Sequence, residues 1–136
     1  MKINDRNRFD QELKLVLGDL PTEVHDLLEE VPLMVEDYPS EQICDAMNLE
    51  FRDDVCGRYQ GVALIHRSVE PSTNAAESDL PESIQIFREG LVATSRNKRG
   101  AVSVPELRRR IRVTILHEIG HRFGMDESEL KVLSQR

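Results

Sequence analysis

One segment near the C-terminus carries signals for both ends of a long helix, and it constrains the fold more than any other part of the chain. Ser103 can accept a hydrogen bond at the helix start, and Glu106 can complete a capping box with it. Pro105 is tolerated in a first helical turn. Gly124 can adopt the positive φ that ends many helices. The sequence therefore predicts a helix from Ser103 to about Phe123.

The two sides of this helix differ in character. Its apolar residues recur at helical spacing and should pack on a core: Val104, Leu107, Ile111, Ile115 and Ile119. Arg108 and Arg112 interrupt that side, and we interpret them as long side chains whose charged ends reach solvent. The opposite side carries Arg110, Val113 and Thr114 together with two histidines, so it is the side available for a site.

Helical spacing also marks the first third of the chain. A stripe of apolar residues indicates an N-terminal helix: Phe9, Leu13, Val16, Leu17 and Leu20. Leu20-Pro21 should end or kink this helix. A short helical pattern follows through Val24, Leu27 and Leu28, and another short helix is expected from Glu41 to Met47.

The remaining elements are three strands, a loop and a last helix. The strands are predicted over 31–35, 59–65 and 84–88. Residues 68–82 are expected to form a long loop that could be one rim of a cleft. The last helix is expected to be capped by Asp126 and Glu129 and buried through Leu130 and Leu133. Together the elements predict an α+β fold in one domain over 1–136, because the length suits a single core.

Composition restricts the partners and the location. The net charge of −7 and the pI near 5.1 argue against nucleic acid, which usually needs a basic face. The polar first residues and the lack of a long apolar run signal neither secretion nor membrane insertion. Cys44 and Cys56 are too few for a disulfide framework, so we expect two half-buried thiols in a cytoplasmic protein.

The long helix carries the pattern His-Glu-x-x-His at His117, Glu118 and His121. Four residues advance a helix by about 400°, so the two imidazoles lie about 40° apart on adjacent turns and can share one cation. Glu118 lies about 100° from His117, where it can reach a metal-bound water as a general base. The other histidines, His25 and His66, are interpreted as surface or structural residues.

A catalytic zinc site needs a third protein ligand and one open position. The spacing from His121 through Gly124 to Glu127 resembles the extended metzincin motif, in which the chain turns back under the metal. Glu127 is the predicted third ligand of Zn²⁺. Asp126 and Glu129 stay open as alternatives, although capping the last helix would occupy both.

With this motif in place, the chain resembles a family of small bacterial zinc metallopeptidases with a minimal zincin-like fold. The shared landmarks span most of the sequence: Leu20-Pro21, Val35-Glu36-Asp37 with Pro39, Gly57 to Gly61, Leu80-Pro81, 84–88 and Phe123-Gly124. The resemblance implies a small mixed sheet packed by helices, with His117 and His121 as ligands and Glu118 as the catalytic acid and base. The chain departs from the family at Arg122, often histidine, and at Glu127, usually aspartate. It also lacks the methionine turn of full metzincins.

Three functions compete. The arrangement favours a zinc-dependent peptidase that acts on an unknown peptide or protein. The His-x-x-x-His spacing with a ligand six residues on also resembles a bacterial ribonuclease family of ribosomal RNA maturation, but the acidic charge and Glu118 favour the peptidase. The third is a non-catalytic zinc-binding adaptor. Tyr59 is conceivable as an oxyanion donor, but we interpret it as a packing residue.

Overall fold

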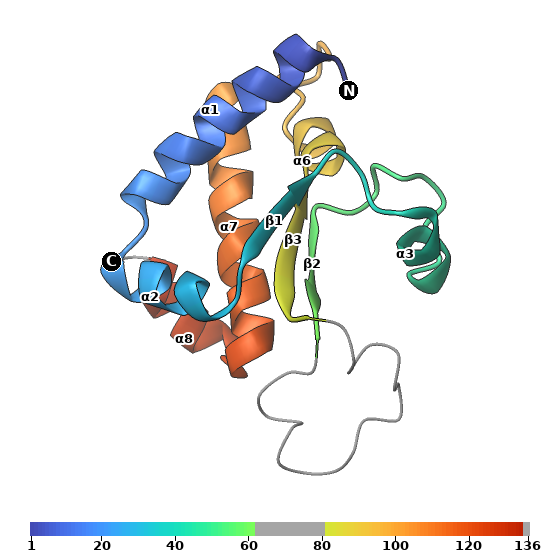
Figure 1. Ribbon diagram of the computed structural model, residues 1–136. Helices are drawn as coiled ribbons and strands as arrows, with labels where there is room; N and C mark the ends of the chain where they lie inside the picture. Colours follow the sequence, from blue (N-terminus) through green and yellow to red (C-terminus); the bar gives the residue numbers. More distant parts are fainter. Residues whose placement is uncertain (62–80, 135–136) are drawn as a thin grey trace.

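The computed structural model describes residues 1–61 and 81–134, which form the expected α+β fold around a small mixed sheet. The elements follow in the order α1 (Ile3–Asp19), α2 (Thr22–Glu30), β1 (Leu33–Glu36), α3 (Glu41–Ala46), β2 (Gly57–Gln60), β3 (Ser83–Phe87), α6 (Arg88–Thr94), α7 (Val104–Phe123) and α8 (Glu127–Ser134). Figure 1 shows α7 against the sheet, with α1 crossing it.

The sheet has the strand order β1-β3-β2, so β3 is its centre. β1 runs parallel to β3, with Leu33 opposite Ile84, and β2 runs antiparallel to it, with Gly57 opposite Ile86. Ile84 and Ile86 are fully buried, as expected for a central strand whose side chains meet packed neighbours. β2 lies at one edge of this sheet and also contacts α7, so it connects the sheet to the helix with the histidines.

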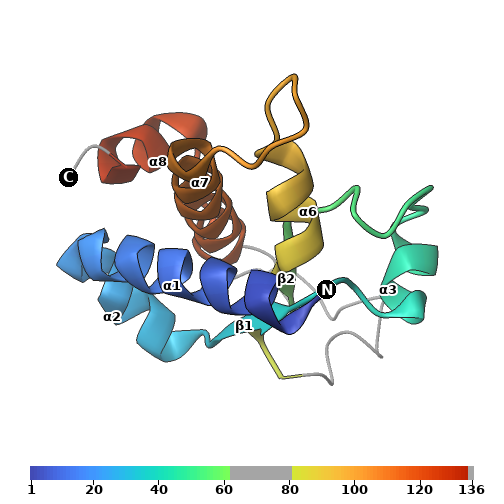
Figure 2. The same ribbon diagram turned by 90° about the horizontal axis from the view of Figure 1, so that it is seen from above.

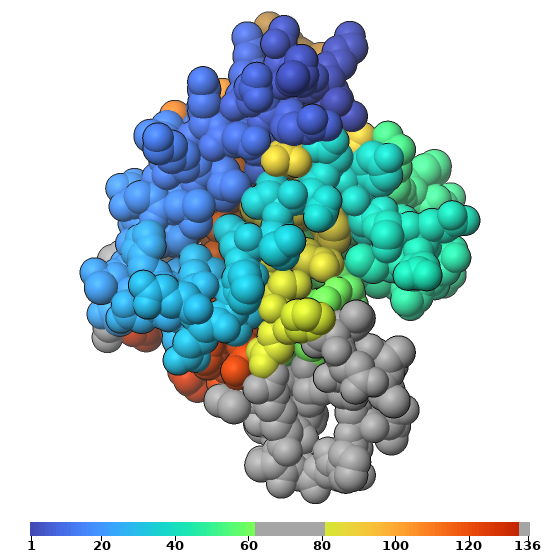
Figure 3. Space-filling model, viewed as in Figure 1, coloured from blue at the N-terminus to red at the C-terminus, as the bar shows by residue number. Residues whose placement is uncertain are grey.

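The core lies between the sheet and the helices that cover it. Its buried members come from six elements and the turns next to them: Phe9, Leu13, Val16, Leu20, Val24, Val31, Ile84, Ile86, Leu91, Leu107, Ile111, Ile115, Leu116, Ile119 and Leu133. Each large apolar side chain buried in this way contributes roughly 1.5–3 kcal/mol. Seen from above, α1 and α7 lie beside each other on one side of the sheet (Figure 2). On the face in Figure 3, side chains of α1 and α2 cover most of α7.

Ion pairs hold α1 against the end of the sheet where β1 and β3 finish. Arg88, at the start of α6, donates to Asp10 of α1 and to Asp37 after β1. Arg6 donates to the same Asp37. The hydrogen bond from Arg6 is the main reason that the pKa of Asp37 lies below its ordinary value. α1 is therefore fixed both by its apolar stripe and by a charged cluster at its N-terminal half.

The predicted helices at 9–20, 24–28, 41–47 and 103–123 and the last helix are confirmed. The strand expected at 31–35 begins at Leu33, because Val31 ends α2 and is buried in the core. The strand expected at 59–65 is β2, described to Gln60, and its later part lies outside the described residues, as do 68–80 of the predicted loop. β3 ends at Phe87, so the prediction that Arg88 continues the strand is wrong; Arg88 opens the unpredicted helix α6.

Two details of α7 differ from expectation. Val104 is 41% exposed, so its assignment to the core is wrong: it is the first helical residue and lies at the edge of the core. Ser103 accepts from the N–H of Glu106 as predicted, but its own N–H donates to the carbonyl of Ser95. The Glu106 carboxylate binds Arg109 and Arg110 instead, so the capping box is only half formed.

None of the helices in the described part of the chain, residues 1–61 and 81–134, is both long enough and apolar enough to cross a membrane.

Candidate metal centre

The last two turns of α7 bring two imidazoles and one carboxylate together. One nitrogen each of His117 and His121 and one oxygen of Glu118 all lie within 4.8 Å of one another. The two rings have centroids 4.5 Å apart at an angle of 61°. Both histidines are exposed, and the His121 side chain keeps 56% of its surface in solvent. The group therefore opens to solvent on the histidine side, which is the arrangement that the spacing predicts.

Glu118 differs from the histidines because its side chain is only 7% exposed and lies against β2. Burial raises its pKa above the ordinary value, since the charged form loses solvation. His117, the cation of Arg58 and a hydrogen bond from the main-chain N–H of Tyr59 act in the opposite direction. The result is a carboxyl group that holds a proton more readily than an exposed glutamate does.

One carboxylate oxygen of Glu118 lies close to the imidazole of His121. Oε1 lies 3.1 Å from Nδ1 of His121, but the contact lacks hydrogen-bond geometry. Within the described residues this oxygen is buried without a hydrogen-bond partner. A buried polar atom of this kind is costly unless a ligand or solvent satisfies it. Two imidazole nitrogens beside such an oxygen form a donor set that suits Zn²⁺ and a water held next to it.

Gly57 at the start of β2 permits the close approach of α7. A methyl group there would lie 2.6 Å from Cγ2 of Thr114 and 2.9 Å from the carbonyl oxygen of Gln85. The same methyl group would lie 3.6 Å from Cγ of Glu118. Glycine at this position therefore brings the strand to the helix face that carries Glu118.

Gly57→Ala is expected to lower the free energy of unfolding by about 1–3 kcal/mol, because the added carbon must push α7 or β3 away. Chemical denaturation measures the change. The matched control is Gly18→Ala in α1, where an added carbon meets nothing within 4 Å. That variant is expected to be more stable by about 0.5–1 kcal/mol, since alanine has the higher helix propensity. Equal effects from the two variants would refute the proposed close contact at Gly57.

Gly120, inside the motif, has a similar role on another side of α7. A methyl group there would lie 2.8 Å from a terminal carbon of Leu130 in α8. Leu130 therefore packs directly on the backbone of α7 at Gly120, the residue before His121. This packing brings the start of α8, where the candidate third ligands lie, back toward the metal-binding turns.

Glu127 is the first residue of α8 and is exposed. It lines a groove of about 380 Å³ together with His117 and Leu130, so it lies on the same side of the helix as the site. Among the described residues, however, the group within 4.8 Å holds only His117, Glu118 and His121, and Glu127 stands outside it. Asp126 accepts from the N–H of Glu129 at 2.8 Å, as expected for the cap of α8. The predicted third ligand is thus near the site without contacting it.

The other candidates for a site lie apart from this group. Cys44 and Cys56 are free and half-buried, as predicted, and neither belongs to the group. His25 is exposed on α2, and His66 lies outside the described residues. Tyr59 donates its hydroxyl to Glu82 at 3.0 Å, while its main chain meets Glu118.

Arg122 and Glu82 form a contact next to the site that the sequence did not predict. Arg122 is buried and donates to Glu82, which immediately precedes β3. The motif marked Arg122 only as a departure from the resembled family. Its spacing of four residues from Glu118 could have placed both on one face of the helix.

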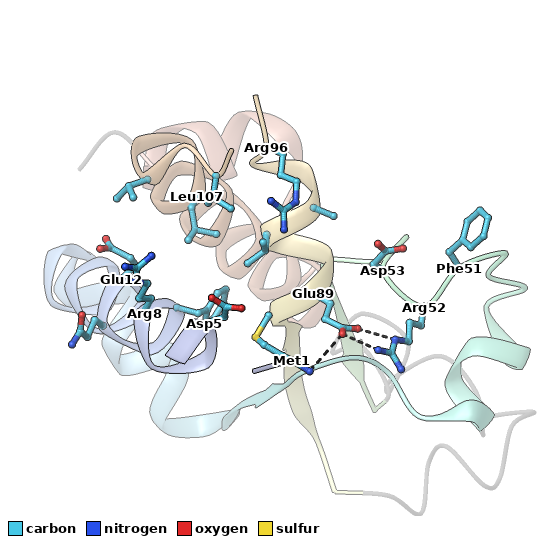
Figure 4. A pocket seen from close by; sticks show the side chains of 16 residues that line it. Met1, Asp5, Arg8, Glu12, Phe51, Arg52, Asp53, Glu89, Arg96 and Leu107 are labelled. Carbon is cyan, nitrogen blue, oxygen red and sulfur yellow. Dashed lines mark hydrogen bonds and ion pairs between the residues drawn. The ribbon is translucent and has the colours of Figure 1, made fainter. Parts of the chain in front are cut away.

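A separate cavity of about 830 Å³ lies at the other end of α7, between α1 and α6 (Figure 4). Its lining includes Phe9, Leu107 and Arg96. Glu89 at its edge forms ion pairs with Arg52 and with the terminal amino group of Met1. Since none of the three motif residues lines this cavity, it is separate from the candidate metal centre.

Comparison with known proteins agrees with this geometry. No curated protein sequence matches the chain. The family model of zincin-like metallopeptidases matches residues 28–136, a span that contains the sheet, α7 and α8. The resemblance inferred from the motif is thereby confirmed, and the chain belongs to the zincin-like metallopeptidase family.

Proposed function

We propose that this protein is a zinc-dependent peptidase in which Glu118 is the general base. Membership of the family implies a metal ion, typically zinc. The observation that carries the proposal is the meeting of two imidazoles and a buried carboxylate oxygen within 4.8 Å. His117 and His121 would hold the zinc ion, with Glu127 as the third ligand.

Bound zinc at such a site supplies a Lewis acid that polarises a carbonyl group and acidifies a water molecule. Glu118 removes the proton from the attacking water at its unpartnered oxygen and delivers it to the leaving amine. The raised pKa of Glu118 suits both halves of this task, since a stronger base accepts the proton more readily and can still release it.

To act as a ligand, Glu127 would have to join the group formed by His117, Glu118 and His121. It lies on the first turn of α8 and is exposed, so its side chain is able to change rotamer without disturbing the core. Asp126 is already engaged as the cap of α8. These two observations support Glu127 over Asp126 as the third ligand.

A digest of unstructured peptides tests the activity. Zinc-loaded protein is incubated with a mixed peptide library, and new termini are identified by mass spectrometry. We expect cleavage that stops when a chelator removes the metal and returns when Zn²⁺ is restored. Tight zinc binding without cleavage would contradict a peptidase and support a non-catalytic zinc-binding domain.

A further inference from the structure

Arg122 is an unusual residue for the last turn of α7, because an arginine near a helix end is usually solvated and this side chain is only 9% exposed. Its Nε donates to Glu82, and its Nη1 is buried without a hydrogen-bond partner among the described residues. A buried cation must be paired to be tolerated, so the contact with Glu82 is essential to the position of this side chain. The pair joins the last turn of α7 to the start of β3.

Glu82 also links Arg122 to β2. The hydroxyl of Tyr59 donates to the same Oε2 that receives Arg122. Gly61 makes room for this bond, since a methyl group there would lie 2.8 Å from the Tyr59 hydroxyl and 2.9 Å from Cγ of Glu82. Tyr59 is thus held by its side chain at the point where its main-chain N–H binds Glu118.

These contacts form a closed ring that includes the candidate base, Glu118. It runs from Glu118 through the main chain and hydroxyl of Tyr59 to Glu82, on to Arg122, and back along one turn of α7. Glu118 and Arg122 are four residues apart, the spacing at which a glutamate and an arginine on a helix attract each other. Within the described part of the chain, the ion pair of Arg122 is made with Glu82 and not with Glu118.

We propose that Arg122 and Glu82 are positioning residues: their ion pair, through Tyr59, fixes the side chain of Glu118. The placement follows from the contacts alone. Its effect on catalysis rests on the proposed peptidase function.

Amide exchange tests the placement without reference to activity. In Arg122→Met and Glu82→Gln, exchange of the Tyr59 amide measured by NMR is expected to accelerate on the order of tenfold, because its hydrogen bond to Glu118 loosens. The amide of Ile111 reports global opening and should not change by the same factor. Arg109→Met is the matched control, since Arg109 pairs with Glu106 on the exposed side of the same helix. Tyr59→Phe removes only the hydroxyl and is a milder test if the charge variants fold poorly.

Kinetics then test the catalytic part. Arg122→Met is expected to lower kcat by roughly tenfold and Tyr59→Phe by a smaller factor, with KM unchanged, because both substitutions loosen the base and leave the proposed metal ligands in place. In a Glu118→Gln background the same substitutions should have no further effect. An equal loss in both backgrounds, or unchanged exchange of the Tyr59 amide, would overturn the proposal. Faster exchange in a protein that cleaves no peptide would support the placement and refute the peptidase function instead.

Discussion

Replacing Glu118 with glutamine is expected to abolish most peptide hydrolysis while leaving the fold and the bound zinc in place. Glutamine has nearly the same shape, but it cannot take a proton from water, and loss of a general base lowers the rate by roughly 10²–10⁴-fold. The fold should tolerate the change, since burial already disfavours the charged carboxylate at this position. The ratio kcat/KM measures the loss of hydrolysis, elemental analysis measures the zinc content, and the thermal midpoint of unfolding measures the stability of the fold.

The matched control is Glu29→Gln, an exposed glutamate in α2 that is not among the candidate ligands. It should change neither the rate nor the zinc content. If Glu118→Gln kept the full rate, another group would be the base, and the burial of Glu118 against β2 would have only a structural meaning.

The double variant His117→Ala/His121→Ala is expected to lose zinc completely. Two of the three proposed protein ligands disappear, and a zinc ion held by one carboxylate alone would exchange freely with solvent. Both histidines are exposed, so the apo-protein should unfold at nearly the same denaturant concentration as apo wild type. Elemental analysis after dialysis measures the metal. Full zinc occupancy in this variant would contradict the assignment.

The same assay separates the candidates for the third ligand. Glu127→Ala should weaken zinc binding far more than Glu129→Ala, because Glu127 lines the groove beside His117. Asp126→Ala should mainly destabilise α8 by about 1 kcal/mol, the usual effect of losing a cap. The reverse order of zinc affinities would move the third ligand to another acid.

Local signals in the sequence predicted the helix that carries the site. They also predicted that the two histidines of its motif lie on the same side of that helix. Ser103 and Gly124 mark the two ends of α7 because caps depend only on neighbouring backbone groups, and Gly124 indeed has a φ of 65°. The meeting of His117 and His121 likewise follows from helix geometry alone.

What the sequence could not predict depends on contacts between distant segments. Periodicity places Val104 on the apolar side of α7 but says nothing about where the core ends, so its exposure was missed. The pairing of Arg122 with Glu82 joins residues 40 positions apart, and no local pattern marks it. The close approach of the backbone at Gly57 to Thr114 also depends on tertiary structure. The position of the third ligand depends on how α8 approaches α7, which the spacing in the sequence only suggests.

X-ray absorption at the zinc edge tests the central claim, that the two imidazoles of α7 hold the metal. The account predicts a zinc ion bound by two imidazoles and by oxygen ligands, with no sulfur in its first shell. Sulfur scattering from Cys44 or Cys56, or a spectrum with fewer than two imidazoles, would show that the metal binds elsewhere.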